Sequence, residues 1–221
     1  AAMGAYPSFI TVGLTSNKKD INWYKNFTRG IEIITNEYDI RLIGGDITFG
    51  DLNVCVNVFG YCYKNPILRS NAKPNDLIYI SGTLGKGRKG LTDWQNNKKS
   101  EYISDFFRPK ARFDIAEYIS NFASSCIDVS DGLIKDLSSI CKLSKVGAII
   151  KFEDIPITND IKDLSYGDDY ELCFTCGKEY EDILNAQGLK PIGKIVEGLN
   201  LELLKENKKV KFTESGWDSF E

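Results

Sequence analysis

The stretch Ser124–Leu137, "SSCIDVSDGLIKDL", carries an apolar run into the start of a helix and places polar side chains at the junction. Asp128 and Ser130 are two residues apart, so on a strand they share one face. Ser130 or Asp131 could cap the following helix, whose expected apolar stripe is Leu133, Leu137, Ile140 and Cys141. Capping does not account for Asp128, because a carboxylate in an apolar strand costs free energy unless it is paired or coordinated. A metal site and a plain helix cap are both open readings of this stretch.

The charge of these side chains limits the ligand that they could hold. The N-terminus of a helix favours anions, but carboxylates placed there would repel a phosphate group unless a cation lay between them. Mg²⁺ binds carboxylate oxygens and completes its coordination with water and substrate phosphates. If the stretch has a ligand, we expect Mg²⁺ together with a phosphate group.

Composition narrows the possible chemistry further. The chain has 221 residues, 42% of them hydrophobic, and a net charge of −3 without a run of like charge, so we expect a globular protein that binds neither nucleic acid nor a membrane surface. The sequence has no apolar stretch near the roughly twenty residues that span a bilayer and no signal-peptide pattern at its start, which predicts a cytoplasmic protein. Histidine is absent, which removes the commonest general base, the Ser-His and Cys-His nucleophile systems and the usual zinc ligand.

The six cysteines fit a cytosolic protein in which they serve as small hydrophobic residues. Cys173 and Cys176 form a C-x-x-C pair, but on one strand they would point to opposite faces, and the sequence contains no second pair. We therefore favour core packing over a metal or redox role for them.

The first part of the chain predicts an α/β layer. Residues 1–9, "AAMGAYPSF", read as the middle of an element, so we expect the chain to begin inside a larger domain. Apolar residues at helical spacing predict a helix over residues 17–38, and a short strand, "IRLI", then ends in Gly44-Gly45-Asp46. Alternating apolar residues over 52–58 predict a further strand.

The aperiodic, proline-containing segment over residues 61–76 predicts a domain boundary, with residues 1–63 and 64–221 on its two sides. Beyond it, expected strands alternate with expected helices, which predicts a second α/β domain with a mixed sheet. The expected strands cover residues 77–82, 126–129, 147–152, 170–175 and 190–196, the helices 85–94, 111–122, 132–143 and 178–186, and a hairpin 201–212.

Three further places in the sequence carry candidate site residues. Asp46 follows Gly45 at a strand end, where glycine lets a ligand approach the backbone, although a tight turn is the simpler reading. Asp168 and Asp169 follow a glycine before a strand, which a turn explains equally well. Arg69 lies in a loop near a proline and could supply a cation to a phosphate group.

Seven motifs, taken in order, resemble those of the thiamine-monophosphate kinases. They are "AAMGA", "GGDIT.G", "LRSNAKPNDLIYISGTLG", "RP.AR", "IDVSDGL..DL", "G.DYELCF" and "GWDSF". The family belongs to an ATP-binding superfamily that also contains aminoimidazole ribonucleotide synthetase, selenophosphate synthetase and a hydrogenase maturation protein. The resemblance covers essentially the entire chain, and "DYELCF" and "GWDSF" point to the kinases in particular.

The resemblance implies a fold, a reaction and a set of site residues. The fold would be a dimerising N-terminal α/β domain, partly present at residues 1–63, followed by a C-terminal α/β domain with a mixed sheet, in a homodimer. The reaction would be direct transfer of the γ-phosphoryl group of ATP to thiamine monophosphate, giving thiamine diphosphate and ADP with Mg²⁺ and without a catalytic side chain. By motif, the ATP-binding residues would be Gly45, Asp46, Arg69 and Ser130, the Mg²⁺ ligands Asp46, Asp128 and Asp131, and the substrate-binding residues Asp168 and Trp217.

The chain departs from the family pattern in two ways. The family has Glu at the position of Asp168, which is one methylene shorter. The family segment that precedes "AAMGA", with its aspartate-rich glycine loop and further metal ligands, is not in this sequence, so we expect an incomplete metal site and little or no activity from this chain alone. The absence of histidine suits the implied chemistry, because a phosphate oxygen that is already anionic needs no strong general base.

Two alternative functions stay open at this point. One is another enzyme of the same superfamily, resembling aminoimidazole ribonucleotide synthetase or acting on selenide. The other is a truncated module that binds a nucleotide without turnover. The aromatic "GWDSF" favours a substrate with a flat ring, as thiamine has.

Overall fold

The computed structural model describes residues 1–211 and 216–217. By their internal contacts, these residues form two compact units: a smaller unit of residues 5–63, and a larger unit of residues 1–4 together with the chain from residue 64 onward. The division of the chain into family domains at residues 1–63 and 64–221 stays a prediction. The first four residues pack with the larger unit and not with the strand that they lead into.

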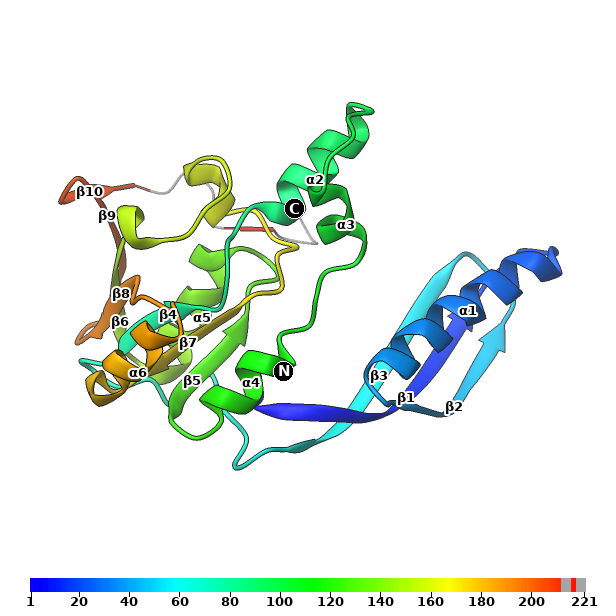
Figure 1. Cartoon of the computed structure of the whole chain (residues 1–221), viewed down its shortest axis with the longest axis horizontal. Helices are drawn as coiled ribbons and strands as arrows, with labels where there is room; N and C mark the ends of the chain where they lie inside the picture. Colours follow the sequence, from blue (N-terminus) through cyan, green and yellow to red (C-terminus); the bar gives the residue numbers. More distant parts are fainter. Residues whose placement is uncertain (212–215, 218–221) are drawn as a thin grey trace. The chain divides into compact units, whose positions relative to one another are not determined.

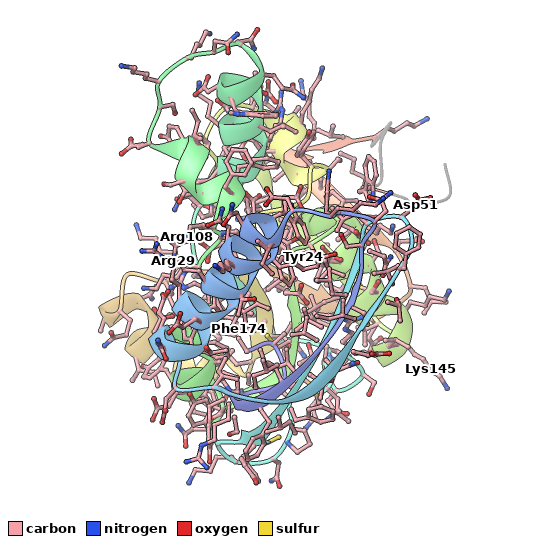
Figure 2. All side chains as sticks on the ribbon, turned by 90° about the vertical axis from the view of Figure 1, so that its right-hand side faces the viewer. Tyr24, Arg29, Asp51, Arg108, Lys145 and Phe174 are labelled. Carbon is pink, nitrogen blue, oxygen red and sulfur yellow. The ribbon has the colours of Figure 1, made fainter. Side chains whose placement is uncertain are left out.

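The smaller unit is a three-stranded sheet covered on one face by a helix (Figure 1). Its elements are β1 (Ala5–Thr15), α1 (Ile21–Glu37), β2 (Arg41–Thr48) and β3 (Asn53–Cys62), in the sheet order β2-β1-β3. Strand β1 runs parallel to β2 and antiparallel to β3. Figure 2 shows Tyr24 and Arg29 on α1, and Asp51 in the connection between β2 and β3.

The buried residues of the smaller unit lie on its central strand and at Ser16, directly after it. Alternate residues of β1 (Ile10, Val12 and Leu14) are buried, as period-two patterning requires. The outer strands expose apolar side chains instead, with Val58 61% and Ile47 67% accessible. This unit therefore leaves apolar surface on both edge strands.

The predicted end of the second strand is wrong. The sequence placed the strand end in Gly44-Gly45-Asp46, but β2 includes these residues and continues to Thr48. Strand β1 approaches so closely that a Cβ at Gly45 would lie 2.1 Å from the Val12 carbonyl oxygen. The glycine thus permits the pairing of two strands, which sequence reasoning had taken as a sign of a turn.

The larger unit is built on a seven-stranded mixed sheet in the order β10-β9-β6-β8-β4-β7-β5. Its strands are β4 (Leu77–Ile80), β5 (Ala123–Asp128), β6 (Gly147–Lys151), β7 (Leu172–Cys176), β8 (Gly193–Val196), β9 (Leu201–Lys205) and β10 (Lys208–Val210). The β6–β9 pair is parallel, and the other neighbouring strands pair antiparallel. The predicted mixed α/β fold is confirmed.

Helices cover the sheet of the larger unit. They are α2 (Lys86–Gln95), α3 (Tyr102–Phe107), α4 (Phe113–Ile119), α5 (Leu133–Ser144) and α6 (Glu181–Ala186), with short 3-10 turns at Phe152–Asp154, Ile161–Leu164 and Lys178–Tyr180. The apolar stripe of α5 is buried in the main core, as its spacing predicted. Helix α3 was not predicted, because its six residues are too few to establish a period.

The central strands β4 and β7 of the larger sheet are almost entirely buried. Tyr79 of β4 stacks on Phe174 of β7, labelled in Figure 2, with ring centroids 5.3 Å apart. Cys173 and Cys176 are both fully buried in β7 with free thiols, and burial raises the pKa of the Cys176 thiol to about 12. These two cysteines act as packing residues. Within the described ranges, the helices are all too short or too polar to cross a membrane.

Candidate functional site

Three loops of the larger unit meet beside the ends of neighbouring strands: one after β4, one after β5 and one before β7. The Asp168 N–H donates to the Ser130 carbonyl oxygen at 3.1 Å, and the Tyr170 N–H donates to that of Val129 at 2.9 Å. The backbones are so close that a Cβ at Gly167 would lie 1.9 Å from the Ser130 carbonyl oxygen. Strand pairing between β5 and β7 thus brings two of the predicted motifs together.

The loop between β5 and α5 is not capped as the sequence suggested. Ser130 and Asp131 do not cap α5 with their side chains; the N-cap residue is Gly132, which has none. The helix is capped from within by Asp136, whose Oδ2 atom accepts the N–H groups of all three residues. Plain capping therefore does not explain Ser130 and Asp131, and their side chains remain available for another role.

Negative charge is concentrated around this loop. Burial raises the pKa of Asp136 to about 6; the N–H groups of Asp131 and Ser130 oppose this, and the charges of Asp131 and Asp128 raise it further. Asp128 ends β5 and is half-buried, and its carboxylate has no hydrogen bond or ion pair with residues 1–211, 216 or 217. A cation near Asp128 and Asp131 would relieve this repulsion.

Asp128 and Arg69 line the same pocket, of about 350 Å³, together with Met3, Ile67, Arg112 and Tyr170 among others. Arg69 itself is exposed, and its carbonyl oxygen accepts the Ser144 hydroxyl at 2.9 Å. The structure thus places a predicted phosphate-binding arginine beside a predicted metal ligand.

The "YGDDY" loop holds Asp168 in an unusual backbone conformation. Asp168 and Tyr170 both have positive φ, 63° and 53°, which costs free energy for residues other than glycine. The Tyr170 hydroxyl donates to Asp168 Oδ1 at 3.1 Å. Strained backbone of this kind concentrates at functional sites, which supports Asp168 as a site residue and identifies Tyr170 as its neighbour.

Trp217 lies beside the same loops although it is far away in the sequence. Its N–H donates to the Asp131 carbonyl oxygen at 2.9 Å, and its own carbonyl oxygen accepts the Lys135 ammonium. Lys135 also pairs with Asp131 at 3.1 Å. Gly216 permits this approach, since its Cβ would lie 2.6 Å from the Asp131 carbonyl oxygen and its φ is +137°. The rest of the "GWDSF" motif, residues 218–220, lies outside the described residues.

Together the loops enclose a pocket of about 680 Å³ with carboxylates and aromatic rings in its wall. It is lined by Leu91, Phe106, Ser130, Asp131, Ser165, Tyr166, Gly167, Asp168, Tyr170, Gly216 and Trp217. Four predicted site residues thus share one pocket. Sequence reasoning missed Phe106, Tyr166 and Tyr170, whose only signal was the closeness of two of them to Asp168 along the chain.

Gly45 and Asp46 belong to the smaller unit. Both line a pocket of about 620 Å³ walled by α1 and β2, with Tyr24, Phe27 and Ile31 from the helix. Asp46 Oδ1 accepts the N–H of Ile47 at 2.8 Å and the residue is exposed. Its carboxylate therefore has coordination capacity left.

The donor set fits a hard divalent cation. No group of three or more potential ligand side chains occurs within the ranges that the structure describes, so a site resembling structural zinc is not formed there. Mg²⁺ needs only one or two carboxylates, with water and phosphate oxygens completing its shell. Asp128, the last residue of β5, and Asp131, in the loop that follows, have oxygens uncommitted to the backbone and meet that requirement.

Comparison with known proteins identifies relatives of this chain. Residues 1–62 match the family described as AIR synthase related protein, N-terminal domain. The thiamine-monophosphate kinase of Buchnera aphidicola subsp. Schizaphis graminum is 39% identical over 100% of this chain and 76% of its own length.

Relatives are found among solved structures as well. The kinase of Stenotrophomonas maltophilia K279a aligns with a TM-score of 0.82 and 30% identity over 91% of this chain and 73% of that one. A structure of AaThiL with AMPPCP and TMP aligns with a TM-score of 0.84 and 26% identity over 97% of this chain and 75% of that one. The chain belongs to the thiamine-monophosphate kinase family.

Proposed function

We propose that this chain transfers the γ-phosphoryl group of ATP to thiamine monophosphate, giving thiamine diphosphate and ADP. The observation that carries the proposal is the pocket that Asp131, Asp168 and Trp217 line together. It combines carboxylates that could hold a metal ion for a phosphate group with an exposed aromatic ring, and the chain belongs to this kinase family. The complex of AaThiL with an ATP analogue and TMP supports the same pair of ligands.

The aromatic wall of the pocket suits the thiamine end of the acceptor. Trp217 is 66% accessible and Tyr170 38%, so each has a ring face available for stacking on a flat cationic ring. Asp168 adds a negative charge beside them, oriented by the Tyr170 hydroxyl. We assign Asp168 and Trp217 to acceptor binding.

The assignments of the nucleotide and metal ligands follow the family motifs. We assign Gly45, Asp46, Arg69 and Ser130 to ATP, with Arg69 as the positive charge for a phosphate group. We assign Asp46, Asp128 and Asp131 to Mg²⁺. When bound, Mg²⁺ would supply the positive charge that offsets repulsion between donor and acceptor phosphates.

The protein's part in the reaction is positioning. No side chain is assigned as nucleophile or general base, because the attacking atom is a phosphate oxygen that is already anionic. The loops bring donor and acceptor together and exclude alternative orientations, which can account for a large part of the barrier reduction.

We also propose that the protein is a cytoplasmic homodimer that pairs through the smaller unit. The exposed Val54, Val56 and Val58 of β3, an edge strand, support this, because an uncovered apolar edge strand tends to pair with another chain. Sedimentation analysis of the chain and of the Val56→Lys variant tests it. A dimer that becomes a monomer is the expected result, and a monomeric wild type contradicts the assignment.

The activity is tested by following thiamine diphosphate formed from ATP, thiamine monophosphate and Mg²⁺, with EDTA as the control. We compare the chain with a version extended at its N-terminus by the corresponding segment of a relative, since the chain spans 76% of the Buchnera enzyme. Product in either version, dependent on Mg²⁺, supports the proposal. Absence of product from both, with each folded, contradicts it and favours a binding module or another acceptor.

A further inference from the structure

Two helices begin at the site, and at the start of each a carboxylate of the chain binds backbone N–H groups. At α5, Asp136 Oδ2 accepts the N–H groups of Ser130, Asp131 and Gly132 at 3.0, 3.1 and 3.1 Å. Asp136 is 5% exposed. Three successive N–H groups of this kind form a concave site for an anion, and here one buried oxygen atom occupies it.

The second case is α2, where the carboxylate comes from a distant part of the sequence. Asp169 accepts the N–H of Gly85 at 2.7 Å and that of Gly87 at 3.2 Å, one with each oxygen. The close packing of this loop against the "YGDDY" loop requires glycine, since a Cβ at Gly87 would lie 2.4 Å from the Asp168 carbonyl oxygen. Asp169 therefore ties the start of α2 to the loop that carries Asp168.

These contacts differ from ordinary helix caps. An ordinary cap comes from the side chain of the N-cap residue, but both N-cap residues are glycines, Gly132 and Gly85, with positive φ. Asp136 binds the N–H groups of the N-cap Gly132 and of the two residues before it. Asp169 binds those of the N-cap Gly85 and of Gly87. Both carboxylates therefore fix the backbone that leads into a helix.

We propose that Asp136 and Asp169 are positioning residues that fix the β5–α5 loop and the "YGDDY" loop and so hold Asp131 and Asp168 toward the pocket. This inference rests on the proposed function. It adds two residues, which touch backbone N–H groups and neither substrate, and it assigns them to different ligands. Asp136 acts on the metal and ATP through the β5–α5 loop, and Asp169 acts on the acceptor through Asp168.

The test uses the full chain and its Asp136→Asn and Asp169→Asn variants. ATP binding is measured by titration calorimetry with Mg²⁺ and with EDTA, and binding of thiamine monophosphate is measured in the presence of Mg²⁺ and AMPPCP. We expect Asp136→Asn to lower the ratio of ATP affinity with Mg²⁺ to that with EDTA about tenfold, with acceptor affinity within about twofold. We expect Asp169→Asn to weaken acceptor binding about tenfold and to leave that ratio unchanged.

Asp93→Asn is the matched control. Asp93 is 2% exposed on α2, bonded through both oxygens to Lys89 at 2.8 Å, and its replacement changes the net charge by the same amount. It can lower thermal stability but is expected to leave the Mg²⁺ ratio and acceptor affinity unchanged. If either site variant fails to fold, Asp136→Glu and Asp169→Glu, which keep the charge and misplace it, are measured in its place with the same expected split.

The outcomes separate this inference from the proposed function. Absence of ATP binding by the wild type contradicts both the inference and the proposed function. Parallel loss of both ligands in each variant, as in a merely structural role, overturns the inference, and so does ATP binding by the wild type that is independent of Mg²⁺. Product formation by the wild type with either of these results leaves the proposed function intact. The expected split without any product from the wild type supports the inference and contradicts the proposed function.

Discussion

The loops of the larger unit carry two sets of carboxylates that differ in what they bind. Asp163 is fully buried, and its oxygens accept Arg88 Nη1 at 2.8 Å and the N–H of Asn159 at 2.7 Å. Asp131 lies nearby with a side chain that is 38% accessible and one ion pair, to Lys135. Carboxylates of the first kind have their capacity committed to the fold, whereas those of the second kind retain oxygens for a ligand. Substitution should therefore separate stability from activity.

The largest expected effect follows from removing the charge of Asp128. We expect Asp128→Asn to lower the rate of phosphoryl transfer at least about a hundredfold, because a partner of the transferring phosphates is lost, with little change in the free energy of unfolding. Steady-state rates and urea denaturation measure the two quantities. Asp182→Asn, at an exposed carboxylate on α6, is the control with wild-type behaviour. A large loss of stability without loss of rate would place Asp128 in the first set.

The next prediction concerns the close backbone contact between Gly167 and Ser130, which joins two loops of the site. Gly167→Ala puts a methyl group at the position 1.9 Å from the Ser130 carbonyl oxygen, so we expect a loss of about 2–3 kcal/mol in the free energy of unfolding, together with weaker binding of both ligands. Gly30→Ala, in α1 with no heavy atom within 4 Å of the added Cβ, should stabilise by about 0.5–1 kcal/mol. Wild-type stability of Gly167→Ala would show that the loops can separate without cost.

Replacing Trp217 tests which of the two ligands contacts the exposed ring in the pocket. We expect Trp217→Ala to raise the KM for thiamine monophosphate about tenfold through loss of stacking, while the KM for ATP changes less than about twofold. Trp94→Ala is the control, because Trp94 is also exposed, at 52%, but pairs with Phe107 on α2 and α3. An equal rise in both KM values would remove Trp217 from the acceptor.

The sequence predicted those elements whose residues repeat. The stripe of α5, the alternation in β3 and the hairpin of β9 and β10 all follow from period and turn chemistry. The extent of β2 did not follow, because Gly45 looks like a turn residue until β1 is known to approach it. Long-range contact, which no local pattern records, decided that case.

The candidate site shows the same limit. Asp128 could be singled out because a carboxylate at the end of an apolar strand has no local explanation. Asp136 could not, because its place one turn into α5 looks like an ordinary helical position, and only the fold of the β5–α5 loop brings three N–H groups to it. For Asp169, the partners are 84 and 82 residues away. Residues that act through the backbone of distant loops leave little trace in the sequence.

The smallest expected effect is a pH dependence of the free energy of unfolding that is caused by the buried carboxyl group of Asp169. Burial raises the pKa of Asp169 from 3.8 to about 6, against the opposing N–H groups of Gly85 and Gly87, and the charges of Asp163 and Glu171 raise it further. A raised carboxyl pKa means that the folded state binds the proton more tightly than the unfolded state does. The contribution to stability is therefore complete below about pH 4 and is lost as the pH rises from about 4 to about 6.

Urea denaturation at pH 4.5 and at pH 7 measures this contribution, which is on the order of 1 kcal/mol. Asp169→Asn should flatten that part of the pH dependence, whereas Asp168→Asn, one residue away but facing the pocket, should keep it. Equal slopes in all three proteins would mean that Asp169 is solvated like its neighbour. If only Asp169→Asn loses the pH slope of stability, the fold keeps a buried charge at Asp169 at a cost in stability near neutral pH. Such a cost is expected where a charge serves a functional site.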